Sequence, residues 1–168
     1  MTLNFNHFNP ACQKTDFRPP EDASEQAEES ATLEKYECPK PRILVYSPDD
    51  DVRYLFKTIL EIWDFDVIEA DNFGNSVAAA QNNHLDLVLM DTEHAFSESF
   101  SKMRKMKKSG WFKEIPFVLI SGHAQEDIRL MALAAGADDF LVKPVNLALL
   151  EIILKSRLKN DDPPIVSN

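Results

Sequence analysis

Residues 87–91 read Leu-Val-Leu-Met-Asp, a fully apolar run that ends on a carboxylate. A short, uninterrupted apolar run is typical of a strand buried on both faces, as the strands of a parallel sheet are. Outward from this run, Arg42–Tyr46 and Pro116–Ile120 have the same character. The centre of the chain therefore indicates a sheet covered by helices on both faces.

Strand and helix patterns alternate from Arg42 to Leu158. The predicted strands are Arg42–Tyr46, Asp66–Ala70, Leu87–Met90, Pro116–Ile120 and Phe140–Val142. Apolar residues recur at helical spacing over Val52–Trp63, Ser76–Asn82, Phe96–Met103, Ile128–Leu133 and Leu147–Leu158. This alternation predicts an α/β fold, a doubly wound five-stranded parallel sheet with five helices.

The two ends of the chain lack this pattern. Residues 1–40 are rich in Asn, Pro, Glu and Ser, and Glu21–Ser30 is acidic with no hydrophobic period. We therefore predict a disordered acidic arm there, since such a segment buries too little apolar surface to become ordered. Residues 159–168 are predicted to be a flexible tail. The domain is expected over residues 41–158, standing alone with no output domain after it.

The composition argues against several classes of protein. A net charge of −10 disfavours nonspecific binding to nucleic acid or to an anionic membrane surface. No apolar run is long enough to cross a membrane, the N-terminus has no secretion signal, and both cysteines, Cys12 and Cys38, lie outside the patterned region. We therefore expect a cytoplasmic protein. The four glycines lie too far apart for a phosphate-binding loop, which argues against an NTPase or a dinucleotide enzyme.

Polar residues follow the predicted strands at their carboxyl ends, where open α/β sheets collect their chemistry. Asp91 follows the third strand, Ser121 the fourth and Lys143 the fifth, while Ser47 and Asp49 follow the first. A carboxylate, hydroxyls and an ammonium thus converge at one edge of the sheet. We expect Lys143 to lie near salt-bridge range of Asp91, because no other group at this edge offers Lys143 a better charge.

Four motifs at these strand ends carry a family resemblance. They are RILV (42–45), DLVLMD (86–91), PFVLISG (116–122) and AGADDFLVKP (135–144). In this order they resemble the receiver domains of two-component response regulators, and the resemblance covers the chain from about Arg42 to Leu158. It implies the flavodoxin-like receiver fold and a place in phosphorelay signal transduction, with a histidine kinase or a phosphotransfer protein as partner.

The resemblance also implies a role for individual residues. Asp91 matches the aspartate that accepts phosphate, and Ser121 and Lys143 match the residues that contact the phosphate. Phe140 matches the switch aromatic residue of the family. The peptide bond between Lys143 and Pro144 is expected to be cis, as it is in such domains.

The chain departs from the family directly after the first strand. Receivers normally carry two acidic residues there, which hold Mg²⁺ together with the phosphoacceptor, and these positions align with Ser47 and Pro48. Asp49 follows one place late. Asp91 and Asp49 are therefore the candidate metal ligands, both weak. We expect Mg²⁺ to bind weakly and phosphorylation to be slow, because Mg²⁺ supplies much of the electrostatic stabilisation in phosphoryl transfer.

These observations predict a stand-alone response-regulator receiver that accepts phosphate poorly on Asp91 and acts by binding another protein, not as an enzyme. Its last helix, Leu147–Leu158, carries more apolar residues than one buried stripe requires, so part of this surplus should be exposed. A face for a downstream partner is one interpretation of the surplus, and simple deep burial of the helix is the other. The alternative is a pseudo-receiver, in which the same fold is a phosphorylation-independent interaction module. A metal-dependent phosphatase with Asp91 as nucleophile is a rival from another class, and Glu93 is its only candidate for an acidic partner.

Overall fold

The computed structural model of this chain describes residues 39–92 and 96–158. The two cysteines, the predicted flexible tail and nearly all of the predicted acidic arm lie outside the described residues. The predictions of a disordered arm and a flexible tail therefore stay predictions.

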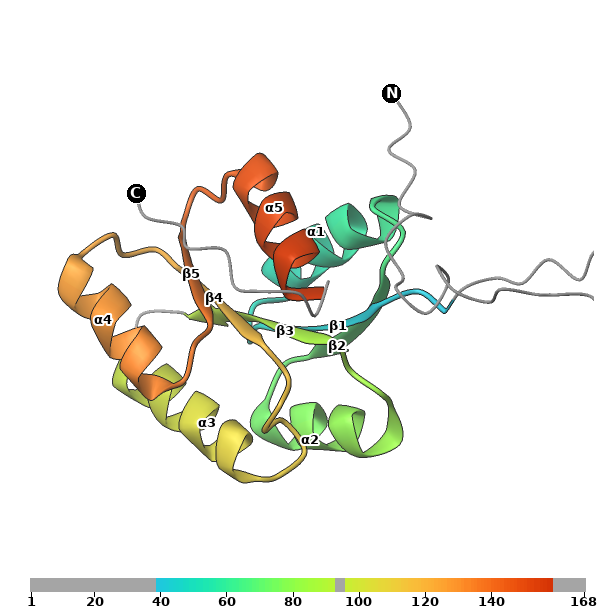
Figure 1. Cartoon of the computed structure of the whole chain (residues 1–168), viewed down its shortest axis with the longest axis horizontal. Coiled ribbons are helices and arrows are strands. Elements are labelled where there is room, and N and C mark those ends of the chain that lie inside the picture. Colours follow the sequence, from blue (N-terminus) through green and yellow to red (C-terminus); the bar gives the residue numbers. More distant parts are fainter. Residues whose placement is uncertain (1–38, 93–95, 159–168) are drawn as a thin grey trace, which may run out of the picture. The chain divides into compact units, whose positions relative to one another are not determined.

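Five strands form one sheet with the spatial order β2-β1-β3-β4-β5, and every neighbouring pair is parallel. The strands are β1 (Arg42–Tyr46), β2 (Asp66–Ala70), β3 (Leu87–Thr92), β4 (Phe117–Ser121) and β5 (Asp139–Val142). The chain winds outward from β1 to β2, then returns past β1 to β3 and continues to β5. This reversal defines a doubly wound sheet, so the predicted fold class is confirmed (Figure 1).

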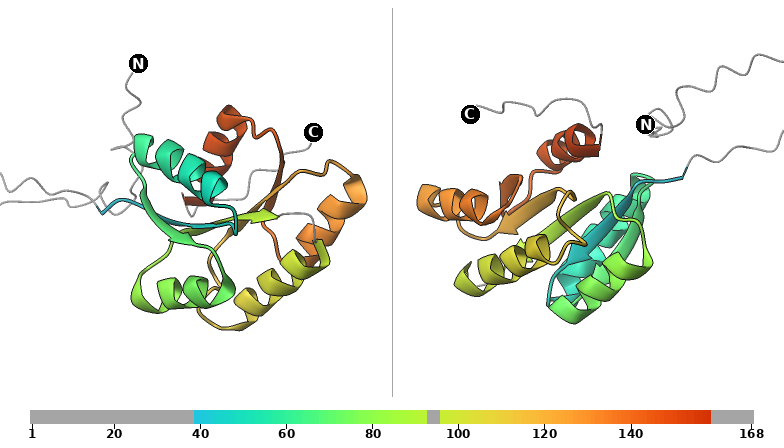
Figure 2. Two further views of the ribbon diagram at one scale, coloured as in Figure 1. Left: turned by 180° about the vertical axis from the view of Figure 1, so that it is seen from behind. Right: turned by 60° about the horizontal axis from the view of Figure 1, so that its bottom comes forward.

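Five helices connect and cover these strands. They are α1 (Asp50–Ile62), α2 (Phe73–Asn82), α3 (Phe96–Lys108), α4 (Glu126–Ala135) and α5 (Leu147–Leu158). Figures 1 and 2 show α1 and α5 on one face of the sheet and α2, α3 and α4 on the other. Among the described residues, none of the helices combines the length and the apolar character that crossing a bilayer requires.

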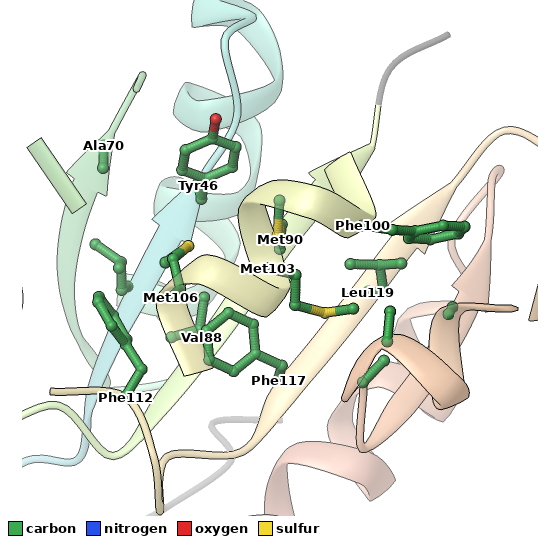
Figure 3. Close-up of a cluster of buried hydrophobic side chains, with 14 of the residues drawn as sticks. Tyr46, Ala70, Val88, Met90, Phe100, Met103, Met106, Phe112, Phe117 and Leu119 are labelled. Carbon is green, nitrogen blue, oxygen red and sulfur yellow. The ribbon is translucent and has the colours of Figure 1, made fainter. Parts of the chain in front are cut away.

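The core consists of two apolar layers, one on each face of the sheet, because successive strand residues point to opposite faces. On the side of α2 to α4, the rings of Phe112 and Phe117 meet edge to face at 5.9 Å, and Met103 and Met106 of α3 are fully buried (Figure 3). On the other side, the helices contribute the buried residues Phe56, Leu60, Leu150, Ile153 and Leu154. The two layers hold all five strands in place, and with them the polar residues at the strand ends.

The structure extends several elements beyond their predicted ends, and β3 and α2 are two of them. Strand β3 continues through Asp91 to Thr92, because these two residues pair with Ile120 and Ser121 of β4. Helix α2 begins at Phe73 rather than at Ser76, and the Asn72 side chain caps it by accepting a hydrogen bond from the Asn75 N–H at 2.9 Å. The first extension matters for function, since it places Asp91 inside the strand rather than on a loop.

Candidate functional site

Asp91 is a buried carboxylate on β3, near the edge of the sheet where the strands end. Its exposed fraction is only 3%. Tyr46, the last residue of β1, pairs with Met90, so that Ser47 lies beside Asp91 in the next position of the register. The Ser47 hydroxyl donates a hydrogen bond to Asp91 Oδ2 at 3.0 Å, and both side chains are buried. Parallel pairing of the two central strands therefore positions the contact.

Lys143 follows β5 and supplies the positive charge of the site. Its Nζ lies 2.6 Å from Asp91 Oδ1, which confirms the expected ion pair. This Oδ1 accepts no aligned hydrogen bond among the described residues, so the contact with the ammonium is mainly electrostatic. The Lys143 backbone N–H donates to the Ser121 carbonyl at 2.7 Å, which fixes the lysine at the strand end. The peptide bond from Lys143 to Pro144 is cis, as the resemblance implies.

Ser121 and Phe140 lie on the neighbouring strands β4 and β5. The Ser121 side chain is fully buried, and its hydroxyl accepts a hydrogen bond from the His123 backbone N–H at 3.2 Å. Ser121 pairs in register with Thr92, one residue after Asp91. Phe140 is partly buried and packs against the apolar layer of α2 to α4. Ser121 therefore lies on the strand next to Asp91, and Phe140 lies one strand further along the sheet.

Asp49 reaches the site through its backbone and not through its carboxylate. Asp49 Oδ1 accepts hydrogen bonds from the N–H groups of Asp51 at 2.8 Å and Val52 at 3.1 Å, which makes Asp49 the N-cap of α1. The Asp49 N–H, in turn, donates to the Ser47 hydroxyl at 3.1 Å. The geometry thus gives this side chain a structural role and lends no support to its prediction as a metal ligand.

The donor set that the described residues place around Asp91 does not fit a divalent cation. Mg²⁺ takes oxygen ligands, and charged carboxylates hold it best. Pro48 has no side-chain oxygen, the Ser47 hydroxyl is neutral and directs its proton to Asp91, and Asp49 caps a helix. Over residues 39–92 and 96–158, no three His, Cys, Asp or Glu side chains come together as a metal site would require. Glu93, the acidic partner in the phosphatase reading, lies outside the described residues.

Sequence reasoning identified Ser47 only as a poor metal ligand and did not identify Arg53 at all. The Arg53 guanidinium donates to the Ser47 carbonyl at 2.5 Å and also pairs with Asp50 on α1. Glu69 of β2 lies 4.0 Å from Arg53 Nε. The only sequence signal was the position of Arg53 one turn into α1, behind the loop that it holds.

The last helix leaves part of its apolar surface in solvent, which confirms the expectation from its composition. On α5, Leu150, Ile153 and Leu154 are buried, whereas Leu147, Leu149 and Ile152 are exposed. Ile152 alone has an exposed fraction of 56%. An exposed apolar surface of this kind often marks a protein contact.

A model of the response regulator receiver domain family matches residues 43–155. The phosphate regulon transcriptional regulatory protein PhoB of Pseudomonas aeruginosa is 26% identical over 121 residues, which is 72% of this chain and 53% of that protein. The two-component response regulator-like protein APRR7 of Arabidopsis thaliana is 30% identical over 114 residues, 67% of this chain and 16% of that protein. The chain thus spans about half the length of the first relative and less of the second.

Solved structures show the same fold. A receiver domain protein of Methanospirillum hungatei, described as CheY-like, has a TM-score of 0.62 and 28% identity, and the match covers 71% of this chain and 94% of that one. A two-component response regulator from Clostridium difficile has a TM-score of 0.65 and 23% identity, with coverage of 74% and 100%. At that identity, the second match supports the fold alone.

Proposed function

Because the chain belongs to the response regulator receiver domain family, we propose that it is a receiver in phosphorelay signalling that accepts phosphate slowly on Asp91. In this proposal the chain acts by binding other proteins and not as an enzyme. A histidine kinase or a phosphotransfer protein donates the phosphate. The stand-alone arrangement and the cytoplasmic location stay predictions.

The observation that carries this proposal is the ion pair between Asp91 and Lys143 at the carboxyl edge of the sheet. Phosphoryl transfer needs a positioned nucleophile and positive charge near the oxygens of the transferred group. Asp91 Oδ1 has the ammonium at 2.6 Å, and no aligned hydrogen bond among the described residues holds this oxygen. Ser121 then serves as the hydroxyl that contacts the phosphate, and Phe140 as the switch aromatic residue.

Slow transfer follows from the same geometry. We propose that Ser47 and Pro48 occupy the places of the family's acid pair, so that Mg²⁺ binds weakly. Without the cation, Lys143 is the main source of positive charge for the developing phosphoryl oxygens. Burial of Asp91 to 3% exposure further restricts the approach of a donor.

The proposed output surface is the exposed apolar side of α5. Leu149 and Ile152 are one helical turn apart and form it, and they are apolar residues that a monomeric fold has no need to expose together. Replacing Ile152 with Asp should weaken capture of the downstream partner without destabilising the fold. Replacing Ile62 of α1, which is also exposed, with Asp is a matched control on another helix.

Labelling with acetyl phosphate and Mg²⁺, followed by intact-mass analysis, tests the phosphoacceptor. We expect the slow addition of a single phosphoryl group, and none in the Asp91→Asn variant. The Asp86→Asn variant, which changes a carboxylate at the opposite edge, should be labelled like the native chain. Labelling that persists in Asp91→Asn would contradict the assignment.

The pseudo-receiver is the second candidate, and the contact between Ser47 and Asp91 favours it. With Ser47 on Oδ2 and Lys143 beside Oδ1, both carboxylate oxygens already have partners inside the fold. If this reading holds, the native chain stays unlabelled, and Asp91→Asn binds the downstream partner as well as the native chain does. Loss of partner binding in Asp91→Asn would favour the phosphorylated receiver instead.

A further inference from the structure

Ser47 forms a hydrogen bond with every one of its polar groups. Its backbone N–H donates to the Ala70 carbonyl at 3.1 Å, and its own carbonyl accepts from Arg53 Nη1 at 2.5 Å. Its hydroxyl accepts from the Asp49 N–H at 3.1 Å and donates to Asp91 Oδ2 at 3.0 Å. The loop after β1 is therefore anchored to β2, α1 and β3 by the chain's own groups.

The direction of the Ser47 hydroxyl proton follows from its two neighbours. A backbone N–H can only donate, so the Asp49 N–H uses a lone pair of the hydroxyl oxygen. An ionised carboxylate can only accept, so the single hydroxyl proton points at Asp91 Oδ2. Asp91 thus has a fixed donor on one oxygen and an ammonium beside the other.

The charges of this site also balance without a cation. Among residues 39–92 and 96–158, Asp91 is the one carboxylate at the centre, and Lys143 Nζ lies 2.6 Å from it, so this pair is neutral. Arg53 lies behind the loop and is itself balanced by Asp50 and Glu69. A dication entering between Ser47 and Asp91 would break the hydrogen bond and would gain no second carboxylate from the described part of the chain in return.

We propose that Ser47 is a positioning residue that takes over the orienting role of a bound cation, so that the Asp91 site is built to work without Mg²⁺. This inference rests on the proposed function only where it concerns phosphate transfer, since the orientation of Asp91 and its indifference to metal can be measured separately. The serine is then a replacement donor and not merely a lost ligand.

A metal titration of the full-length, ¹⁵N-labelled chain tests the first half of the proposal. Mn²⁺, a paramagnetic substitute for Mg²⁺, should broaden no backbone amide signal near Asp91 selectively in the native chain. The Ser47→Asp/Pro48→Asp double variant should show selective broadening of the Asp91 and Thr92 signals. Selective broadening of these signals in the native chain, at metal concentrations that affect the double variant, would overturn the proposal.

Labelling by acetyl phosphate, with Mg²⁺ and with EDTA, tests the second half. In the native chain, the labelling rate with Mg²⁺ should differ from the rate with EDTA by no more than about twofold. In the Ser47→Asp/Pro48→Asp double variant, the ratio of the Mg²⁺ rate to the EDTA rate should be at least about tenfold higher than in the native chain. In Ser47→Ala, we expect the metal-free rate to fall about fivefold while the ratio stays near one, as loss of one hydrogen bond of ordinary strength implies. An unchanged metal-free labelling rate in Ser47→Ala would contradict the positioning role of Ser47.

Ser76→Ala is the matched control, because Ser76 is also fully buried and donates its hydroxyl proton to the carbonyl of Asn72, away from Asp91. It should change neither the rate nor the ratio. If the native chain accepts no phosphate at all, the proposed function fails, and the inference is decided by the metal titration and by the amide signal of Asp91. In that case the Asp91 amide signal should shift in Ser47→Ala and not in Ser76→Ala, and an unshifted signal would overturn the positioning role.

Discussion

The two edges of the sheet use carboxylates in different ways. At the amino edge, Asp86 Oδ2 accepts the backbone N–H of Arg42 at 2.7 Å, and Asp138 Oδ2 accepts that of Phe117 at 2.8 Å. Both carboxylates are only half-buried, and each satisfies the first N–H group of a neighbouring strand. A side-chain cation adds to this arrangement at Asp138, since Lys107 Nζ lies 3.2 Å from Asp138 Oδ2.

At the carboxyl edge, Asp91 is nearly inaccessible, and its described polar partners are side chains from other strand ends. Among the described residues it satisfies no backbone group, so the pairing of the described strands does not depend on its charge. A carboxylate that caps backbone N–H groups contributes to the fold, whereas one that is buried among the hydroxyl of Ser47 and the ammonium of Lys143 contributes little to strand pairing. This difference separates structural from functional acids in one sheet, and it can be tested residue by residue.

The largest effect on stability is expected at the amino edge. Asp138→Ala leaves the N–H of the fully buried Phe117 without its acceptor and removes the carboxylate that pairs with Lys107. We expect the free energy of unfolding to fall by about 2 kcal/mol, the size of a hydrogen bond to a charged group. Urea denaturation measures this change, with the exposed Asp127→Ala as control. A loss no larger than in that control would show that the capping carboxylate is not structural.

A smaller loss is expected when the cation of the site is removed. Lys143→Ala leaves Asp91 buried with Ser47 as its remaining donor. The lysine is about one-third exposed, so solvent screens part of the attraction, and we expect a loss of about 1 kcal/mol. Thermal unfolding would detect it, and Lys108→Ala on α3 provides the control. A loss of stability greater than that of Asp138→Ala would show that the carboxyl edge, and not the amino edge, contributes more to stability.

The acid itself should matter least to stability. Asn has nearly the shape of Asp, and its carbonyl oxygen can still accept from Ser47, so Asp91→Asn removes a buried charge and keeps one acceptor. The free energy of unfolding is expected to change by less than about 1 kcal/mol. Urea denaturation measures this change as well. A loss of stability as large as in Asp138→Ala would mean that Asp91 is a structural acid.

Much of this site could be predicted from the sequence, because strand order and strand ends are readable from apolar runs. Asp91, Ser121 and Lys143 were placed at one edge on that basis. The Asp91–Lys143 ion pair follows from charge alone, since one carboxylate and one ammonium share a buried edge. Pattern and charge, then, predicted which residues meet.

Two features of the site could not be predicted from the sequence. One is the direction of side-chain hydrogen bonds, and the other is strand pairing beyond the apolar residues of β3. Strand β3 continues to Thr92 because β4 pairs with it there, and polar residues carry no apolar signal for that extension. The capping role of Asp49 had a signal, since an Asp followed by two acids commonly starts a helix. The bond from Ser47 to Asp91 had none, because a serine after a strand can turn its hydroxyl in several directions.

The smallest effect in this comparison of carboxylates is expected at Asp71, which follows β2 at the carboxyl edge and is exposed. Its Oδ1 accepts from Asn75 Nδ2 at 2.6 Å and from Asn72 Nδ2 at 2.8 Å. The hydrogen bond from Asn75 is the main cause that lowers the pKa of Asp71 below its ordinary value. Asn75→Ala should therefore raise the pKa of Asp71 back towards that value, while Asn82→Ala, at the other end of α2, should leave it unchanged.

The sign of the effect on stability follows from this lowered pKa. A carboxyl group whose pKa is lower in the folded state stabilises the fold above its unfolded pKa, and this contribution disappears as the pH falls through the folded pKa. Asn75→Ala should therefore narrow the stability difference between neutral and acidic pH, and only slightly, because solvent screens an exposed group. A carboxyl-carbon NMR titration of Asp71 gives the direct measurement. If the pKa of Asp71 is unchanged in Asn75→Ala, the hydrogen bond from Asn75 is not the cause, and hydrogen bonds from the backbone N–H groups of Asp71 and Asn72 account for the lowered pKa instead.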